Sequence, residues 1–200
     1  MAIKAVIFDI GGVLLHNNSQ EKERAWETQA GLPEGAIFKF INRSGLGNAA
    51  TRGKISRQEL WSKVSEHFKI DLAQIQAFEA SLVDTEVLNT ELADFLQTLR
   101  PKYKTALLSN AWPGTREALN PKYGLDKLVD IEIFSAEEGM LKPETMFYQV
   151  ALIRLQVRGY ETVFLDDNTV NVDAASLFGI QSIQYRNNEQ AIKEIKRILG

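Results

Sequence analysis

Residues 3–15 read IKAVIFDIGGVLL, and the interpretation of the whole chain starts from this segment. A short apolar run rich in Ile and Val ends at Phe8 and gives way at once to Asp9 and two glycines. Continuous apolar runs of this length are typical of a parallel strand buried on both faces. The segment therefore predicts a buried strand over 3–8 that ends in a functional loop.

The same pattern recurs three times along the chain. The runs are 105–108, followed by Ser109 and Asn110; 131–134, followed by Ser135; and 162–165, followed by Asp166 and Asp167. A weaker fifth strand is expected at 181–185. Helical patterns separate these runs, and strands that alternate with helices predict a parallel sheet covered on both faces. We therefore expect an α/β, Rossmann-like core whose polar residues meet at the carboxyl edge of the sheet.

Residues 16–89 predict three or four helices and no strand. Pro33 fits the first turn of one helix, Ser56 and Glu59 fit a capping box ahead of a second, and Asp71 begins a third. Because this block follows the first strand, we expect it to form an all-helical cap above the carboxyl edge. The expected division is a discontinuous core, 1–15 and 90–200, and a cap, 16–89.

The amino-acid composition excludes several classes of binding partner and of site. The 200 residues include 23 Lys and Arg against 26 Asp and Glu, a net charge of -3, so no broad basic surface is expected for nucleic acid or membrane. A hydrophobic fraction of 44% excludes disorder, and the absence of cysteine excludes disulfides and thiolate sites. No stretch is long enough for a signal or a membrane span, so a cytoplasmic protein with a small-molecule partner is expected. The oligomeric state stays open.

Four motifs occur in a fixed order along the expected core. They are FDIGGVL at 8–14, LLSN at 107–110, Lys142-Pro143 opening a helix, and FLDDNTVN at 164–171. Taken alone, Asp9 is more typical of a turn or helix cap. Together the motifs resemble the haloacid dehalogenase superfamily, whose phosphatase members use four such motifs, and the cap resembles that family's small helical insertion.

The resemblance implies a role for each phosphate-facing residue. Asp9 corresponds to the nucleophile that forms an aspartyl-phosphate. Ser109 and Asn110 correspond to the phosphate-binding motif, where a hydroxyl and neighbouring N–H groups hold an oxygen. Lys142 corresponds to the catalytic and phosphate-binding lysine, whose charge offsets the clustered carboxylates and the phosphate.

The resemblance also implies a Mg²⁺ cofactor, because a carboxylate approaches an anionic phosphate only beside a cation that offsets the repulsion. Asp9, the backbone carbonyl of Gly11 and Asp167 correspond to its ligands. Asp166 corresponds to an outer partner or an alternative ligand, and Asn171 to a supporting residue one helical turn later.

Gly11 departs from the pattern of typical phosphatases, which carry Asp-x-Asp where this chain has Asp9-Ile10-Gly11. The second Asp protonates the leaving oxygen, and glycine cannot. Loss of a general acid costs about 10²–10⁴-fold in rate for a poor leaving group. His16 is a candidate substitute acid, although a solvated histidine at the hinge is the favoured interpretation.

Three functions stay open at this stage. The first is a Mg²⁺-dependent phosphatase that acts on a small phosphorylated metabolite, with sugar phosphates among the candidates. The second is a low-activity phosphate-ester-binding or regulatory protein, and the third is a 2-haloacid dehalogenase. Gly11 favours the second and third, whereas Asp167 and Lys142 favour the first.

Weaker signals concern the cap and the loop after the second core strand. Trp112 is a candidate for lining the pocket. Arg43, Arg52 and Lys54 could reach a substrate anion, but a solvated loop is the favoured interpretation. His67 is expected at the surface.

Overall fold

The computed structural model describes residues 2–83 and 85–200. Its central sheet has five parallel strands in the order β5-β4-β1-β6-β7. They are β1 (Ala5–Phe8), β4 (Lys104–Ser109), β5 (Ile131–Phe134), β6 (Thr162–Asp166) and β7 (Gln181–Gln184). All five predicted strands are present, and the parallel α/β architecture is confirmed.

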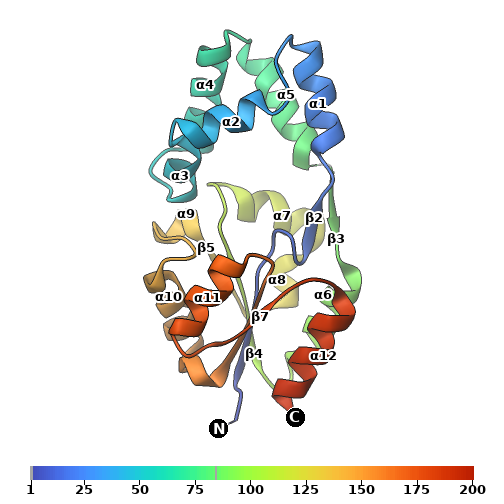
Figure 1. Ribbon diagram of the computed structural model, residues 1–200, viewed down its shortest axis with the longest axis vertical. Coiled ribbons are helices and arrows are strands. Elements are labelled where there is room, and N and C mark those ends of the chain that lie inside the picture. The colour runs from blue at the N-terminus through green and yellow to red at the C-terminus, as the bar shows by residue number, and fades with distance from the viewer. Residues whose placement is uncertain (1, 84) are drawn as a thin grey trace.

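The alternation of side chains along β1 divides the core into two clusters. Val6 and Phe8 pack on one face of the sheet and Ala5 and Ile7 on the other, and all four are buried. The first face is covered by α6 (Thr90–Leu99), α7 (Thr115–Tyr123), α8 (Leu125–Leu128) and α12 (Asn188–Leu199). The second is covered by α10 (Thr145–Leu155) and α11 (Thr169–Leu177) (Figure 1). Helix α9 (Ser135–Glu138) follows β5, and the 3-10 turn Gly159–Glu161 precedes β6.

Five helices form a separate layer above the carboxyl edge of the sheet (Figure 1). They are α1 (Gln20–Gln29), α2 (Ala36–Arg43), α3 (Leu46–Thr51), α4 (Arg57–Phe68) and α5 (Leu72–Val83). Their apolar faces share a core of their own, built around the buried side chains of Trp61 and Phe78. Helix α4 begins after Ser56, whose side chain accepts a hydrogen bond from the Glu59 N–H, and this bond is the Ser56 half of the predicted capping box.

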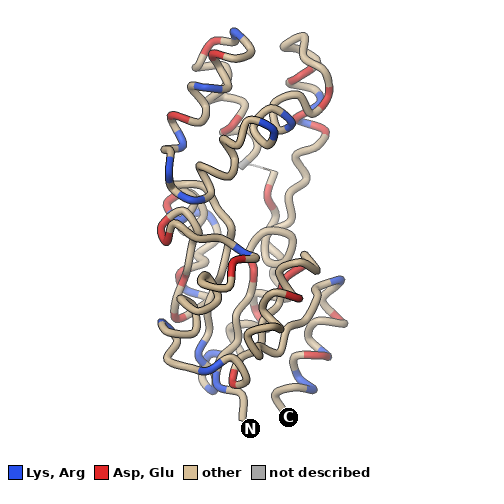
Figure 2. The backbone as a smooth tube through the Cα atoms, turned by 60° about the vertical axis from the view of Figure 1, so that its left-hand side comes forward, with Lys and Arg blue, Asp and Glu red and all other residues tan. Residues whose placement is uncertain are grey.

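Charged residues of both signs are interspersed over the helical part and the sheet part (Figure 2). This distribution accords with the near balance of charges in the sequence. Among the helices in residues 2–83 and 85–200, none combines the length and the apolar character needed to cross a membrane.

The prediction that residues 16–89 contain no strand was wrong. Strands β2 (Leu15–Asn17) and β3 (Glu86–Leu88) pair antiparallel and join the helical part to the sheet part. Each has three residues, too few to show the two-residue alternation by which a strand is recognised in a sequence. The expected domain division at 15/16 and 89/90 stays a prediction; strand β2 crosses the first boundary, and β3 ends at Leu88, before the second.

Two helices begin later than predicted. In both cases the sequence predicted that the proline lies in the first turn of the helix. Helix α2 begins at Ala36 after Gly35, whose φ is 71°, so Pro33 lies in the preceding turn rather than in the helix. Helix α10 begins at Thr145, two residues beyond Pro143. The Ala36 N–H donates to the Pro33 carbonyl and the Glu144 N–H to the Leu141 carbonyl, so each proline belongs to a turn that precedes the helix.

Several contacts between described residues join the helical part to the sheet part. Arg52 on the helical side forms two hydrogen bonds with Glu144. Gly53 passes so close to Ala136 that a Cβ atom there would lie 2.1 Å from the Ala136 carbonyl oxygen. Trp61 meets Trp112 edge to face, with 5.9 Å between ring centroids. These contacts hold the helical layer over the carboxyl edge.

Glu27 on α1 caps the neighbouring helix α2. Its carboxylate accepts hydrogen bonds from the backbone N–H groups of Gly35 and Ile37, and the residue is 1% exposed. Gly35, at the N-cap of α2, has no side chain that could accept these bonds.

We expect Glu27→Ala to lower the free energy of unfolding by about 1–3 kcal/mol, because it leaves two backbone donors without an acceptor in a buried place. Urea unfolding followed by circular dichroism measures the change. The matched control is Glu34→Ala, which removes an exposed carboxylate from an ion pair with Arg24 and should change stability by less than about 0.5 kcal/mol. Equal effects of the two substitutions would contradict the capping role of Glu27.

Candidate active site

The sheet order places three polar residues side by side at its carboxyl edge. Strand β1 lies between β4 and β6, with Phe8 in register with Leu107 on one side and Leu165 on the other. Asp9 follows β1, and Ser109 and Asp166 end the two neighbouring strands. The predicted meeting of these side chains follows directly from this order.

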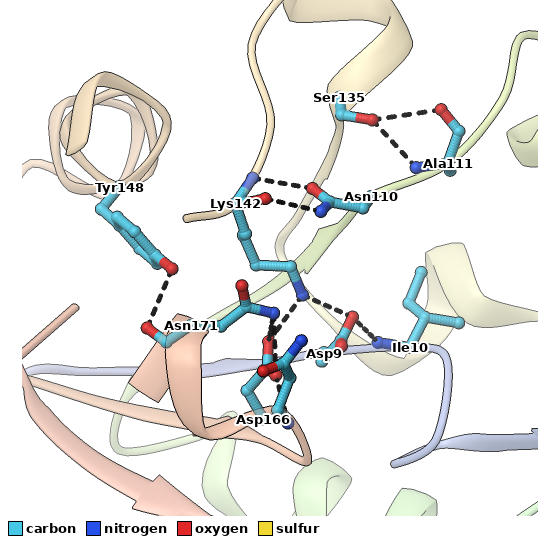
Figure 3. Close-up of polar contacts among 10 residues, drawn as sticks. Asp9, Ile10, Asn110, Ala111, Ser135, Lys142, Tyr148, Asp166 and Asn171 are labelled. Carbon is cyan, nitrogen blue, oxygen red and sulfur yellow. Dashed lines mark hydrogen bonds and ion pairs between the residues drawn. The ribbon is translucent and has the colours of Figure 1, made fainter. Parts of the chain in front are cut away.

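Lys142 lies at the centre of the cluster. Its ammonium nitrogen is 2.7 Å from Asp9 Oδ1 and 2.7 Å from Asp166 Oδ2, and the residue is 2% exposed (Figure 3). Its backbone is held by Asn110: the Lys142 N–H donates to Asn110 Oδ1 (2.8 Å), and Asn110 Nδ2 donates to the Lys142 carbonyl (2.8 Å). The loop after β4 therefore fixes the place from which the lysine side chain reaches the carboxylates.

Asp166 is surrounded by hydrogen-bond donors and fully buried. Asn171 Nδ2 lies 3.0 and 3.1 Å from its two oxygens, and the Asn168 N–H donates to Oδ1 at 2.9 Å. Asn171 is held in turn by Tyr148, whose hydroxyl donates to its carbonyl at 2.9 Å (Figure 3). Lys142 is a further donor to Asp166. The carboxylate of Asp166 therefore orients the side chains of Lys142 and Asn171.

The two carboxylate oxygens of Asp9 differ in their contacts: one is bound by protein groups, and the other is available to a ligand. Oδ1 accepts from the Ile10 N–H (2.6 Å) and contacts Lys142, whereas Oδ2 makes no hydrogen bond within the described part of the chain. Burial raises the pKa of the Asp9 carboxyl to about 7; Lys142 opposes the shift and the negative charge of Asp166 adds to it. Oδ2 can therefore meet a phosphorus atom or a cation.

Asp167 completes a group of three carboxylates. Oxygens of Asp9, Asp166 and Asp167 all lie within 4.8 Å of one another. Burial, with the charge of Asp166, raises the pKa of Asp167. Crowded carboxylate oxygens fit a hard divalent cation such as Mg²⁺, because a cation between them relieves their repulsion. Of the pair in the fourth motif, Asp167 is exposed whereas Asp166 is occupied by donors.

The two glycines after Ile10 differ in what surrounds them. A Cβ atom on Gly12 would lie 2.3 Å from Asp167 Oδ2, and the φ of Gly12 is +76°, so glycine is required there. A Cβ atom on Gly11 would meet nothing within 4 Å. Sequence reasoning singled out Gly11 and missed Gly12, although the Gly-Gly pair was a signal for a close approach of the backbone.

Two serines frame the loop after β4. Ser109 ends the strand, and its hydroxyl makes no hydrogen bond to any residue in 2–83 or 85–200, so it is free to bind a ligand oxygen. The Ser135 hydroxyl accepts from the Ala111 N–H (2.9 Å) and donates to the Ala111 carbonyl (3.1 Å). Sequence reasoning noted Ser135 as a strand end but not this role.

The weaker candidates from the sequence lie in other surroundings. His16 contacts Asn89 at 3.5 Å and stacks on Tyr185, with 6.1 Å between ring centroids, rather than on the carboxylate cluster. Arg52 is paired with Glu144. His67 is exposed, as predicted, and so are Arg43 and Lys54.

The chain is similar in sequence to one protein family and to several known proteins. A model of the haloacid dehalogenase-like hydrolases matches residues 3–179. Mouse acyl-CoA dehydrogenase family member 10 is 31% identical over 98% of this chain, which spans 19% of that protein. Pig bifunctional epoxide hydrolase 2 is 26% identical over 100% of the chain, which spans 39% of that protein. The D-ribitol-5-phosphate phosphatase of Bacteroides thetaiotaomicron is 24% identical, covering 99% of both chains.

Two solved structures share the fold over nearly the whole length. A HAD-like family hydrolase from Porphyromonas gingivalis has a TM-score of 0.83 and 28% identity, covering 100% of this chain and 98% of that one. A HAD family enzyme from Bacteroides thetaiotaomicron, in complex with magnesium and inorganic phosphate, has a TM-score of 0.79 and 22% identity, covering 92% and 95%. Since the family model spans residues 3–179, the chain belongs to the haloacid dehalogenase-like hydrolases.

Proposed function

We propose that this hydrolase is a Mg²⁺-dependent phosphatase that acts on a small phosphorylated metabolite through an aspartyl-phosphate on Asp9. The observation that carries the proposal is the buried ammonium of Lys142, 2.7 Å from both Asp9 and Asp166. A lysine held beside a carboxylate nucleophile offsets the charge that accumulates when that carboxylate meets a phosphate dianion.

The proposed reaction has two displacements at phosphorus. Asp9 Oδ2 attacks the phosphorus atom in line, and the bond from phosphorus to the leaving oxygen breaks, which leaves a phosphoryl group on Asp9. A water oxygen then bonds to the same phosphorus atom, the bond from phosphorus to Asp9 Oδ2 breaks, and inorganic phosphate leaves; the proton lost by the water passes to solvent, which also supplies the proton taken up by the first leaving oxygen. Lys142 and the Ser109 hydroxyl bind the non-bridging oxygens in both steps.

The donor set proposed for Mg²⁺ is Asp9, the Gly11 carbonyl and Asp167, with Asp166 and Asn171 as supporting residues. A magnesium and phosphate complex of a HAD family enzyme with this fold supports the assignment, as does the approach of the three carboxylates within 4.8 Å. The cation would neutralise charge on the phosphate and so allow the anionic nucleophile to approach.

For Asn110 we propose a positioning role in addition to phosphate binding. Both polar atoms of its side chain are occupied by the Lys142 backbone. Its side chain therefore orients Lys142, and contact with phosphate falls to the backbone of the loop.

Gly11 favours a second candidate function. In this alternative the protein has a regulatory role, binds phosphate esters and hydrolyses them slowly. The open space at Gly11 shows that no side chain stands where the family acid would begin. The dehalogenase hypothesis is weaker, because release of halide requires no cation and this site gathers three carboxylates.

The first test is the binding of metal. Mg²⁺ at about 100 times its Kd should raise the melting temperature by about 5–10 °C over the value in chelator, because it relieves the repulsion among the carboxylates. Asp167→Asn should abolish the increase, whereas Asp173→Asn, at an exposed position on α11, should retain it. Superimposed melting curves with and without Mg²⁺, together with no heat of binding in calorimetry, would refute the site.

The second test concerns the nucleophile. Asp9→Asn keeps the shape of the side chain but removes its nucleophilic charge, so kcat on an aryl phosphate should fall by at least about 10³-fold. Circular dichroism should show an unchanged fold. A variant that kept a tenth of the wild-type rate would exclude the aspartyl-phosphate mechanism.

The third test concerns the missing acid. Without a proton donor, log kcat/KM should fall steeply as the pKa of the leaving group rises, because the departing oxygen keeps its charge. Gly11→Asp should flatten this dependence and raise the rate on alkyl phosphates, since a Cβ atom fits at this position. A shallow wild-type slope that the substitution leaves unchanged would show that another acid acts; His16→Gln then tests the candidate named from the sequence.

A further inference from the structure

The segment that carries Lys142 runs from α9 to α10, and the helical part contacts it near both ends. Gly53 lies against Ala136 in α9, where a Cβ atom on residue 53 would be 2.1 Å from the carbonyl oxygen. The preceding residue, Arg52, pairs with Glu144, the N-cap residue of α10. Figure 1 shows α3, whose C-cap is Arg52, directly above α9. Two consecutive residues of the helical part therefore bracket the segment from which Lys142 reaches the carboxylates.

The guanidinium of Arg52 is oriented by its own helix before it meets Glu144. Its Nε atom donates to Asn48 Oδ1 at 3.1 Å, one helical turn earlier. Its two terminal nitrogens donate to the two carboxylate oxygens of Glu144, one of them at 3.1 Å. A planar fork that meets both oxygens of a carboxylate fixes an angle as well as a distance, which a single hydrogen bond does not. The pair therefore specifies the orientation of the Glu144 side chain.

Glu144 is connected to Lys142 through a short turn of the backbone. The Glu144 N–H donates to the Leu141 carbonyl at 2.8 Å, and this bond closes a turn that contains Lys142. Asn110 holds the turn from the sheet part, through both backbone groups of Lys142. Arg52 holds the same turn from the helical part, through the side chain of Glu144. Each of the two parts thus supplies one contact that fixes the backbone from which the lysine extends.

The contact between Arg52 and Glu144 supplies orientation more than stability. Their side chains are 24% and 35% exposed, and ion pairs with this exposure contribute little to the free energy of unfolding. The hydrogen bonds from Arg52 lower the pKa of Glu144 against the opposing effect of burial, and the charge of Lys54 adds to the lowering. Glu144 is therefore a carboxylate at neutral pH, with one cation bound and a second one nearby.

We propose that Arg52 and Glu144 are positioning residues for Lys142, and that their pair holds the turn from which the ammonium reaches Asp9 and Asp166. In this account Arg52 acts through Glu144 and the turn, and not on the substrate. The inference rests on the phosphatase function proposed above and adds a means of regulating it. A displacement of the helical part removes one of the two contacts that hold the lysine, so the position of that part controls the reactivity of the site.

The first experiment is a double-mutant cycle on the hydrolysis of an aryl phosphate by the Mg²⁺-loaded enzyme. Arg52→Gln and Glu144→Gln should each lower kcat by about 5- to 20-fold, less than the roughly 100-fold cost of a full ångström of misplacement, because Asn110 still holds the turn. KM should stay within about twofold, since a contact that only docks the substrate would raise KM and leave kcat unchanged.

The double variant distinguishes a pair from two separate residues. Because Lys54 is a second cation near Glu144, Glu144→Gln should lose at least as much activity as Arg52→Gln. The double variant should lose no more than Glu144→Gln alone, since the two residues act as one unit. Arg24→Gln is the control: it breaks an exposed ion pair with Glu34 inside the helical part and should change kcat by less than about twofold. All variants should melt within about 4 °C of the wild-type protein.

A second measurement observes the lysine itself, independently of turnover. In protein labelled with a heavy nitrogen isotope at its lysine side chains, the buried ammonium of Lys142 should give a slowly exchanging NMR signal, assigned by its loss in Lys142→Arg. Arg52→Gln and Glu144→Gln should shift this signal or broaden it through faster exchange with water. Arg24→Gln should leave it unchanged. A pair that only docked the helical part on the sheet part would not move this signal.

Three results would overturn the proposal. They are a kcat within about twofold of wild type in both single variants, a double variant that loses the product of the two single losses, and a Lys142 signal that neither substitution changes. The second result would mean that the residues act separately, as they would if Arg52 bound the substrate directly. Failure of the wild-type protein to hydrolyse the aryl phosphate would refute the phosphatase function instead, and the NMR signal would still test the positioning of Lys142.

Discussion

The ammonium of Lys142, buried between Asp9 and Asp166, is the interaction on which the site depends. A buried cation is tolerated where opposite charges and hydrogen bonds surround it, and removal of one partner leaves the others uncompensated. The neighbouring polar residues maintain this arrangement. Asn110 fixes the lysine backbone, Asn171 fixes Asp166, and both contacts depend on loops that follow parallel strands. The site is thus held together by hydrogen bonds between loops at the carboxyl edge of the sheet.

Much of this arrangement was predictable because it follows from the sheet. The apolar run of β1 and the later runs predict parallel strands, and polar residues that follow such strands meet at one edge. The ribbon of β2 and β3 was not predictable, because its stability comes from pairing between Leu15 and Leu88 across the whole helical part. The link from Asn110 to Lys142 joins two loops whose sequences carry no sign of each other. Ser135 was missed for the same reason.

Gly11 bears on the step in which the leaving group departs. The space beside Gly11 contains no acid, so the departing oxygen depends on its own acidity or on a residue outside the first motif. Binding contacts remote from phosphorus can offset part of that deficit, since binding energy at a distance helps to orient the reacting group.

The central claim, that phosphate passes through Asp9, is tested most directly by the stereochemistry at phosphorus. An isotopically chiral phosphorothioate ester would be hydrolysed by the enzyme in water enriched in a heavy oxygen isotope, and the configuration of the released thiophosphate determined. Two in-line displacements, first by Asp9 and then by water, predict net retention of configuration. Net inversion would mean that water attacks the ester directly, and would contradict the assignment of Asp9 as the nucleophile.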